Sequence, residues 1–151
     1  GVVIHLQTQE GMSATDVEAL LYNQSGLLGV SGISSDMRAL HKSDDPRAAE
    51  AIDLFTLRAA REASALIFSL GGLDGIVFTA GIGENDPLIR AAICERLAWL
   101  GIAIDQDANA RNAPVISTAD SEIVVRVIPT DEERMIAIHT LAALTPAGGQ
   151  S

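Results

Sequence analysis

An apolar run leads directly into a glycine-rich segment at positions 75–85, which read GIVFTAGIGEN. The run from Gly75 to Ala80 is short and nearly continuous, which is typical of a strand buried on both faces of a sheet. Gly81 and Gly83 would let the backbone approach a ligand closely, and Asp86-Pro87 predicts the start of the next helix. Free N–H groups at a helix start favour a phosphate or a nucleotide. A tight structural turn between strand and helix explains the same residues equally well.

Further helix signals flank this segment. A helix is expected from the Ser13 N-cap to about Ser25-Gly26, and a second from Asp45-Pro46 over roughly 25 residues to Gly71-Gly72. The helix that starts at Asp86-Pro87 should end at Gly101. Three glycines between residues 25 and 35 argue against a helix there.

Strand signals alternate with these helices, which predicts an α/β fold. Residues 123–128 are rich in β-branched side chains and predict a clear strand, with weaker candidates at 102–104 and 115–116. A last helix is expected to run to about Leu144, and residues 146–151 are expected to form a frayed tail.

The composition fits one domain covering residues 1–151, of which 48% are hydrophobic. Lys plus Arg number 10 and Asp plus Glu number 20, so the formal net charge is −10, which repels nucleic acid and anionic lipid headgroups. No apolar stretch reaches the ~18 residues of a membrane helix and no leader pattern opens the chain, so we expect a cytoplasmic protein.

The single cysteine, Cys94, excludes a disulfide framework and should pack as a small hydrophobe. The histidines lie far apart, with no paired spacing, at His5, His41 and His139.

A second candidate ligand segment is residues 31–38, which read SGISSDMR. Ser34 or Ser35 would cap a short helix, and Asp36 near its start would suit the helix dipole. This structural explanation leaves Arg38 unexplained, because a planar guanidinium is suited to phosphate or to stacking on a base. From spacing alone, the structural explanation is somewhat favoured.

A third candidate is residues 130–133, which read TDEE. Thr130 and Glu133 have the spacing of a capping box at the start of the last helix. Glu132 is not needed for that cap. A carboxylate at the end of a strand is well placed to hold Mg²⁺, often through water.

A dinucleotide-binding fold is a rival interpretation. Asp105 follows a possible second strand, where a ribose-binding acid would lie. The pattern Gly81-x-Gly83-x-x-Asp86 lacks the third glycine, which weakens this rival. No G-x-x-x-x-G-K-[ST] run occurs, so a P-loop is excluded.

Three long segments resemble the carboxyl-terminal half of the acetate kinases, and propionate kinases share these segments. They are SGLLGVSGISSDMR at 25–38, GGLDGIVFTAGIGEN at 71–85 and VIPTDEE at 127–133. The resemblance runs in order from about Gly11 to about Leu144. Three long motifs in one order are far more specific than any single signal above.

The resemblance implies a domain of the superfamily that contains acetate and sugar kinases, Hsp70 and actin. Its core is a ribonuclease H-like, actin-like ATPase fold, in which a mixed sheet is flanked by helices. Members of this superfamily place ATP between two similar domains. The implied adenosine contacts are Asp36, Met37 and Arg38; the rest of the nucleotide pocket is Gly81, Ile82, Gly83, Glu84 and Asn85; and Glu132 is associated with Mg²⁺.

The implied reaction of the full-length enzyme is ATP + acetate to ADP + acetyl phosphate. The family's amino-terminal half is absent from this sequence, together with the Gly-Thr-Arg segment that precedes the equivalent of Gly1 and the histidine and aspartate beside the transferred group. Phosphoryl transfer depends on positioning and on neutralising charge, so this piece should bind ADP or ATP weakly and show no measurable turnover. The family often has Asn at the position of Asp131 and an apolar residue at that of Arg134, which bears on the packing of the last helix.

Two alternatives stay open at this point. One is a non-catalytic nucleotide-binding or dimerisation module, since the family pairs subunits through this half and a homodimer is expected. The other is a propionate kinase domain, because the pocket for the short-chain carboxylate lies mostly in the absent half.

Overall fold

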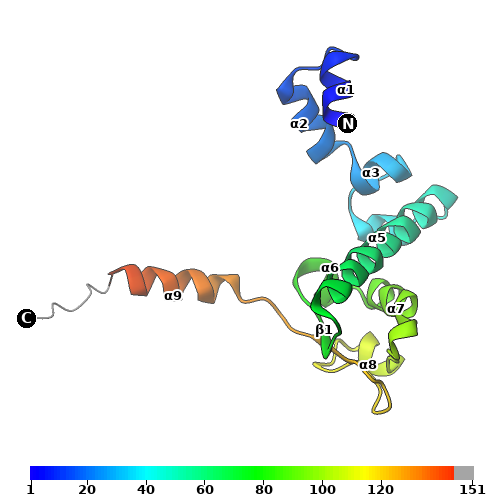
Figure 1. The fold of residues 1–151 in the computed structure, drawn as a ribbon, viewed down its shortest axis with the longest axis vertical. Helices are drawn as coiled ribbons and strands as arrows, with labels where there is room; N and C mark the ends of the chain where they lie inside the picture. The colour runs from blue at the N-terminus through cyan, green and yellow to red at the C-terminus, as the bar shows by residue number, and fades with distance from the viewer. Residues whose placement is uncertain (145–151) are drawn as a thin grey trace, which may run out of the picture. The chain divides into compact units, whose positions relative to one another are not determined.

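The computed structural model describes residues 1–144, apart from the side chains of Glu132, Ala142 and Ala143, so the tail expected at 146–151 lies outside the described residues. In chain order its elements (Figure 1) are α1 Val2–Thr8, α2 Ala14–Asn23, α3 Gly26–Ser31, α4 Met37–His41, α5 Pro46–Leu70, β1 Gly75–Phe78, α6 Ala80–Asn85, α7 Pro87–Arg96, the 3₁₀ turn Ala98–Leu100, α8 Gln106–Ala110, β2 Val124–Val127 and α9 Glu132–Leu144. None of the helices in the described part is long and apolar enough to cross a membrane.

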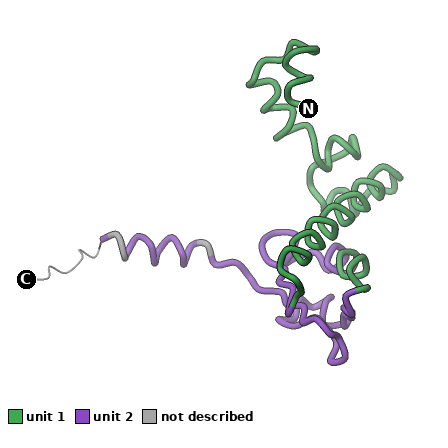
Figure 2. Tube along the Cα trace, in the orientation of Figure 1, with its two compact units in different colours: residues 1–73, 92–99 green, residues 74–91, 100–151 purple. Residues whose placement is uncertain are grey.

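Two compact units make up the described chain (Figure 2). The first contains residues 1–73 and 92–99, and the second contains residues 74–91 and 100–151. The chain passes from one unit to the other after residue 73, after residue 91 within α7, and after residue 99.

The ends of α2 and α5 in the first unit confirm the capping predictions made for these two helices. The Ser13 side chain accepts from the Asp16 amide and the Asp16 carboxylate accepts from the Ser13 amide, so α2 begins with a capping box. At the start of α5 the Asp45 carboxylate accepts from the Arg47 amide at 2.9 Å. Gly71 ends α5 in the left-handed region, at φ +74°, where glycine carries no steric cost.

The prediction that residues 25–35 contain no helix was wrong for part of the segment. Residues 26–31 form α3, and Gly32, at φ +64°, ends it. A Cβ at Gly29 would lie 3.1 Å from the carbonyl oxygen of Gln24. Glycine therefore serves close packing inside this helix, which offsets its unfavourable helix propensity of about 1 kcal/mol.

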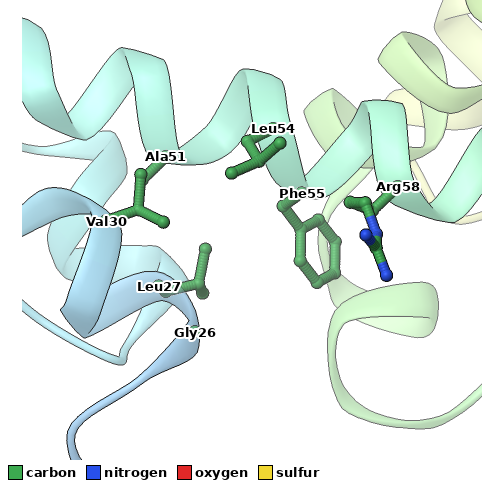
Figure 3. A pocket seen from close by; sticks show the side chains of 7 residues that line it. All are labelled: Gly26, Leu27, Val30, Ala51, Leu54, Phe55 and Arg58. Carbon is green, nitrogen blue, oxygen red and sulfur yellow. The ribbon is translucent and has the colours of Figure 1, made fainter. Parts of the chain in front are cut away.

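The core of the first unit forms where α4 and α5 meet. Leu40, Ala48 and Ala51 are each 1% exposed, and the partly buried Leu27, Ile33 and Ile52 pack against them. Beside this core, α3 and α5 border an apolar hollow of about 180 Å³, with the side chains of Leu27, Val30, Leu54 and Phe55 around it (Figure 3). Cys94 is 2% exposed, which confirms its predicted packing.

The second unit is built on a parallel strand pair. β1 and β2 align with Gly75 opposite Val124 and Phe78 opposite Val127. Antiparallel bridges join Ile104 to Ser117 and Val115 to Arg126, at the places where the weaker strands were expected.

The prediction that β1 is buried on both faces was wrong. Among the described residues β1 pairs with β2 alone, whereas β2 also bridges to Val115. The face of the pair that carries Val77 and Val124 is therefore incompletely covered, although Val125 and Val127 on the other face are buried. Val77 is 52% exposed as a result.

The expected turn after β1 is itself a helix. Residues 80–85 form α6 directly after the strand, and α7 begins at the predicted Pro87. A Cβ at Gly83 would lie 3.4 Å from the backbone carbon of Phe78, so glycine at this position lets α6 fold back tightly against the end of β1.

Leu40→Ala tests the core of the first unit. Leu40 is 1% exposed, so the substitution should lower the free energy of unfolding by about 2–5 kcal/mol. Urea unfolding followed by circular dichroism measures this loss. Leu70→Ala is the matched control, because Leu70 is 73% exposed and its loss should stay within about 0.5 kcal/mol. Equal losses for the two variants would contradict the assignment of this core.

Candidate nucleotide-binding site

One carboxylate, that of Glu84, links the glycine-rich segment by hydrogen bonds to Thr130, which follows β2. Oε1 of Glu84, in α6, accepts hydrogen bonds from the Ala80 amide at 2.7 Å, the Thr130 amide at 2.8 Å and the Thr130 hydroxyl at 3.0 Å. Ala80 lies at φ +58°, in the left-handed region that non-glycine residues rarely adopt. The bond to its amide helps to hold this backbone conformation next to the candidate site.

These hydrogen bonds favour the ionised form of Glu84. Donation from the Thr130 amide and hydroxyl, and then from the Ala80 amide, lowers the pKa of Glu84 below its usual 4.5. Because the folded-state pKa is the lower one, the stabilisation is complete above the unfolded value and is lost as the pH falls through the folded value.

The other end of α6 is held by a buried guanidinium. Arg90, from α7, is fully buried, and its Nη1 donates to the carbonyl oxygens of Gly83 and Glu84, both at 2.9 Å. Its Nε and Nη2 donate to the side chain and carbonyl of Asn109 at 2.8 and 2.7 Å, and Nη2 also donates to the Asn112 side chain at 2.6 Å. The last carbonyls of a helix have no partner inside the helix, so Arg90 supplies donors that α6 itself lacks.

An open hollow of about 480 Å³ lies beside this arrangement. It is lined by Ala80, Gly81, Thr130, Asp131 and Glu133. Among the side chains that the structure describes, no three His, Cys, Asp or Glu residues gather into a metal cage. Mg²⁺ is commonly held by one or two carboxylates together with substrate phosphates, so the carboxylates at this hollow fit a shared Mg²⁺ rather than a site made by the protein alone.

The start of α9 differs from the predicted capping box. Thr130 donates to Glu84 instead of capping the helix, and the cap is Asp131, whose side chain accepts from the Arg134 amide at 3.0 Å. The box fails because the helix begins at Glu132, which puts Thr130 one residue too early to be the N-cap. Glu132, the predicted Mg²⁺ residue, is thus the first residue of α9; its side chain lies outside the description.

Asp36, Met37 and Arg38 lie at the start of α4, in the first unit. The N-cap is Asp36 itself, not Ser34 or Ser35, and it accepts from the Arg38 amide at 2.9 Å. The Arg38 guanidinium turns back onto the same carboxylate, with Nε–Oδ1 at 3.1 Å and Nη2–Oδ2 at 2.7 Å, which lowers the pKa of Asp36. Met37 is buried at 4% exposure, whereas the Arg38 side chain is 86% exposed. Of these three side chains, Arg38 is therefore the most open to a ligand.

The same local geometry occurs a second time. At the start of α5, Arg47 donates through Nε and Nη2 to the Asp45 carboxylate, with Nη2–Oδ2 at 2.7 Å, and this pairing lowers the pKa of Asp45 to about 2. We call this Asp-x-Arg arrangement at a helix start a clasp. The clasp explains why Arg38 follows Asp36 so closely without any ligand.

The remaining predicted site residues lie in α6. Gly81, Ile82, Gly83 and Glu84 occupy consecutive positions in this helix, and the Asn85 amide group donates to the Gly81 carbonyl at 2.9 Å. These residues belong to the second unit and residues 36–38 to the first, so each group is placed within its own unit.

The dinucleotide rival finds no support in this unit. Asp105 caps α8 by accepting from the Ala108 amide at 3.0 Å, which accounts for an acidic residue at this position. The parallel partner of β1 is β2, and Ile104 instead makes an antiparallel bridge to Ser117.

Sequence reasoning missed the roles of Arg90 and Thr130. Arg90 lies four residues before Cys94 and seven before Leu97, the spacing of one helix face, and all three are buried. A charged residue in that apolar row was the available signal. Thr130 gave no comparable signal, because its partner Glu84 is 46 residues away in the sequence.

Comparison with known proteins shows the family to which the chain is similar. Residues 1–138 match the model of the Acetokinase family. The chain is 56% identical over 141 residues to the acetate kinase of Rhodopseudomonas palustris strain TIE-1, which covers 92% of this chain and 35% of that protein.

Two solved structures are similar to the chain as well. The crystal structure of Porphyromonas gingivalis acetate kinase matches with a TM-score of 0.84 and 37% identity, covering 96% of this chain and 38% of that one. A propionate kinase from Francisella tularensis subsp. tularensis SCHU S4 matches with a TM-score of 0.81 and 37% identity, covering 90% of this chain and 36% of that one.

The fold is therefore that of the actin-like ATPase class, as these kinases have it and as the sequence predicts. The chain belongs to the Acetokinase family. It spans little more than a third of the length of the relatives it matches.

Arg90→Lys tests the support of α6. A lysine cannot reproduce the planar fork, so several buried acceptors lose their donors, at about 1–3 kcal/mol for each group left unsatisfied. We expect the free energy of unfolding to fall by more than ~3 kcal/mol in a urea titration. Arg47→Lys, at an exposed clasp, should change it by less than about 1 kcal/mol. A small loss for Arg90→Lys would show that the guanidinium does not support this helix.

Proposed function

We propose that this chain is the nucleotide-binding, carboxyl-terminal part of an acetate kinase. The whole enzyme would catalyse ATP + acetate to ADP + acetyl phosphate. The observation that carries this proposal is the 56% identity to a protein named acetate kinase over 92% of the chain. Support from the geometry comes from the glycine segment, which lies beside an open hollow with carboxylates at its edge.

The proposal assigns nucleotide contacts to the predicted residues 36–38 and 81–85, each considered within its own unit. Arg38 would contribute a planar, exposed guanidinium that the Asp36 carboxylate orients, which suits stacking against a purine. Residues 81–85 would form the rest of the pocket, where Gly81 has open space around its Cβ position. The Ala80 amide is already bonded to Glu84, so it is not among the groups that would hold a phosphate.

Mg²⁺ would be associated with Glu132, and when bound it would neutralise charge on the phosphate oxygens. The adjacent Asp131 and Glu133 line the hollow and add negative charge there. A phosphate would be repelled by these carboxylates alone, so a nucleotide should bind more tightly with Mg²⁺ than without it.

Catalysis needs groups beyond this chain. The resemblance puts the acyl pocket and the residues beside the transferred phosphoryl group mostly in the family's other half, and the chain covers 35% of its R. palustris relative. We infer a cytoplasmic homodimer for the whole enzyme, from the family resemblance.

Two other functions remain candidates. The 37% identity to a propionate kinase makes propionate an alternative carboxylate. A non-catalytic nucleotide-binding or dimerisation module is the second, and it would bind nucleotide without turnover even in the full-length protein.

Arg38→Ala tests the adenosine contact. Loss of the stacking group should weaken Mg·ADP binding by about tenfold in calorimetric titration. Arg47→Ala is a matched control, since it removes the same clasp from a helix outside the proposed site and should leave the affinity unchanged. Equal affinities for Arg38→Ala and the unsubstituted chain would refute the adenosine assignment.

Removal of Mg²⁺ tests the metal association. With EDTA present, ADP affinity should fall by about tenfold or more, and Glu132→Gln should abolish most of the difference between the two conditions. The chain should show no phosphorylation of acetate or propionate by ATP in either condition. Turnover at the rate of an intact kinase would contradict the proposed division of the catalytic groups.

A further inference from the structure

Glu84 ties together the two segments that leave the carboxyl ends of β1 and β2. Three donors converge on its Oε1, one from Ala80 and two from Thr130, at 2.7–3.0 Å. The strands end side by side, because Phe78 is in register with Val127 and the Ile128 amide donates to the Phe78 carbonyl at 2.9 Å. The carboxylate thus extends the contact between the strands into the two segments that follow them.

We propose that Glu84 is a positioning residue, which holds the start of α9 against the glycine segment and is not itself a ligand of the nucleotide. This inference rests on the proposed function and assigns a different role to one of its predicted site residues. Glu132, the residue proposed for Mg²⁺, comes two positions after Thr130. The hydrogen bonds of Glu84 therefore fix Thr130, two residues before α9 begins.

Charge and geometry both favour this role. A phosphate placed against Glu84 would meet a like charge, in addition to the carboxylates of Asp131 and Glu133 at the hollow. The donors from the backbone and from the Thr130 hydroxyl stabilise the charged Glu84 carboxylate, because hydrogen bonds to an ionised group are stronger than those between neutral groups. Glu84 also supplies a partner for the amide of Ala80, whose φ of +58° is unusual for a residue other than glycine.

The test compares ADP with Mg·ADP on the 151-residue chain. Glu84→Gln keeps the size of the side chain but removes its charge, and Thr130→Val removes the hydroxyl while keeping the backbone donor. Mg·ADP binding should weaken about tenfold in Glu84→Gln and about threefold in Thr130→Val, whereas Mg²⁺-free ADP should change less than twofold in either. Thr130→Ser should restore Mg·ADP affinity to within about twofold.

A double variant separates coupling from independent loss. Because both substitutions break one link, Glu84→Gln with Thr130→Val should bind Mg·ADP about as well as Glu84→Gln alone. Asp105→Asn is the control: that carboxylate also accepts from a backbone amide, at 3.0 Å, but lies outside the proposed site. It should leave both affinities unchanged. Urea unfolding of each variant confirms that the protein titrated is folded.

Amide proton shifts test the link without any nucleotide. The Ala80 and Thr130 resonances should both move upfield in Glu84→Gln and stay in place in Asp105→Asn. Unmoved resonances would overturn the proposal, and so would equal loss of ADP and Mg·ADP binding or multiplicative losses in the double variant. If the resonances shift but the chain binds no Mg·ADP, the proposed nucleotide-binding function is wrong. The hydrogen bonds of Glu84 then exist, but they do not position a nucleotide site.

Discussion

A single buried guanidinium organises the second unit. Arg90 is fully buried and donates to the last carbonyls of α6 and to both Asn109 and Asn112. Burying a charge is costly unless its hydrogen bonds are satisfied, so the surrounding acceptors must keep their places for Arg90 to remain buried. The Asn109 side chain in turn donates to the Pro87 carbonyl at 2.8 Å, which extends the network to the start of α7.

α6 is too short to be stable by itself and is held from both ends. A six-residue helix gains little from propagation, so its stability has to come from tertiary contacts. Arg90 satisfies its final carbonyls, and Glu84 satisfies the Ala80 amide at its start while reaching Thr130. The glycines are needed for a different reason, since Gly83 allows the close approach to Phe78. Rigid ends and small side chains together give a defined surface beside the hollow.

Local signals predicted the elements that local chemistry determines. The Ser13 capping box, Asp45-Pro46 at the start of α5 and Gly71 at its end were all readable from neighbouring residues. The helices α3 and α6 were not, because their glycines are favoured by contacts with Gln24 and Phe78 that propensity does not describe. Burial of β1 was also mispredicted: an apolar run indicates two covered faces only if further layers supply the cover, and here Val77 is 52% exposed.

Site residues are harder to predict than elements, and the two clasps show why. Asp36–Arg38 and Asp45–Arg47 have the same spacing, the same N-cap bond at 2.9 Å and the same Nη2–Oδ2 distance of 2.7 Å. Local geometry therefore cannot distinguish a ligand-binding arginine from one that only closes a helix start. The difference has to come from what surrounds each clasp. The Arg38 side chain is 86% exposed, and Arg38 belongs to a segment that resembles the acetate kinases. Arg47 lies outside the three segments that carry this resemblance.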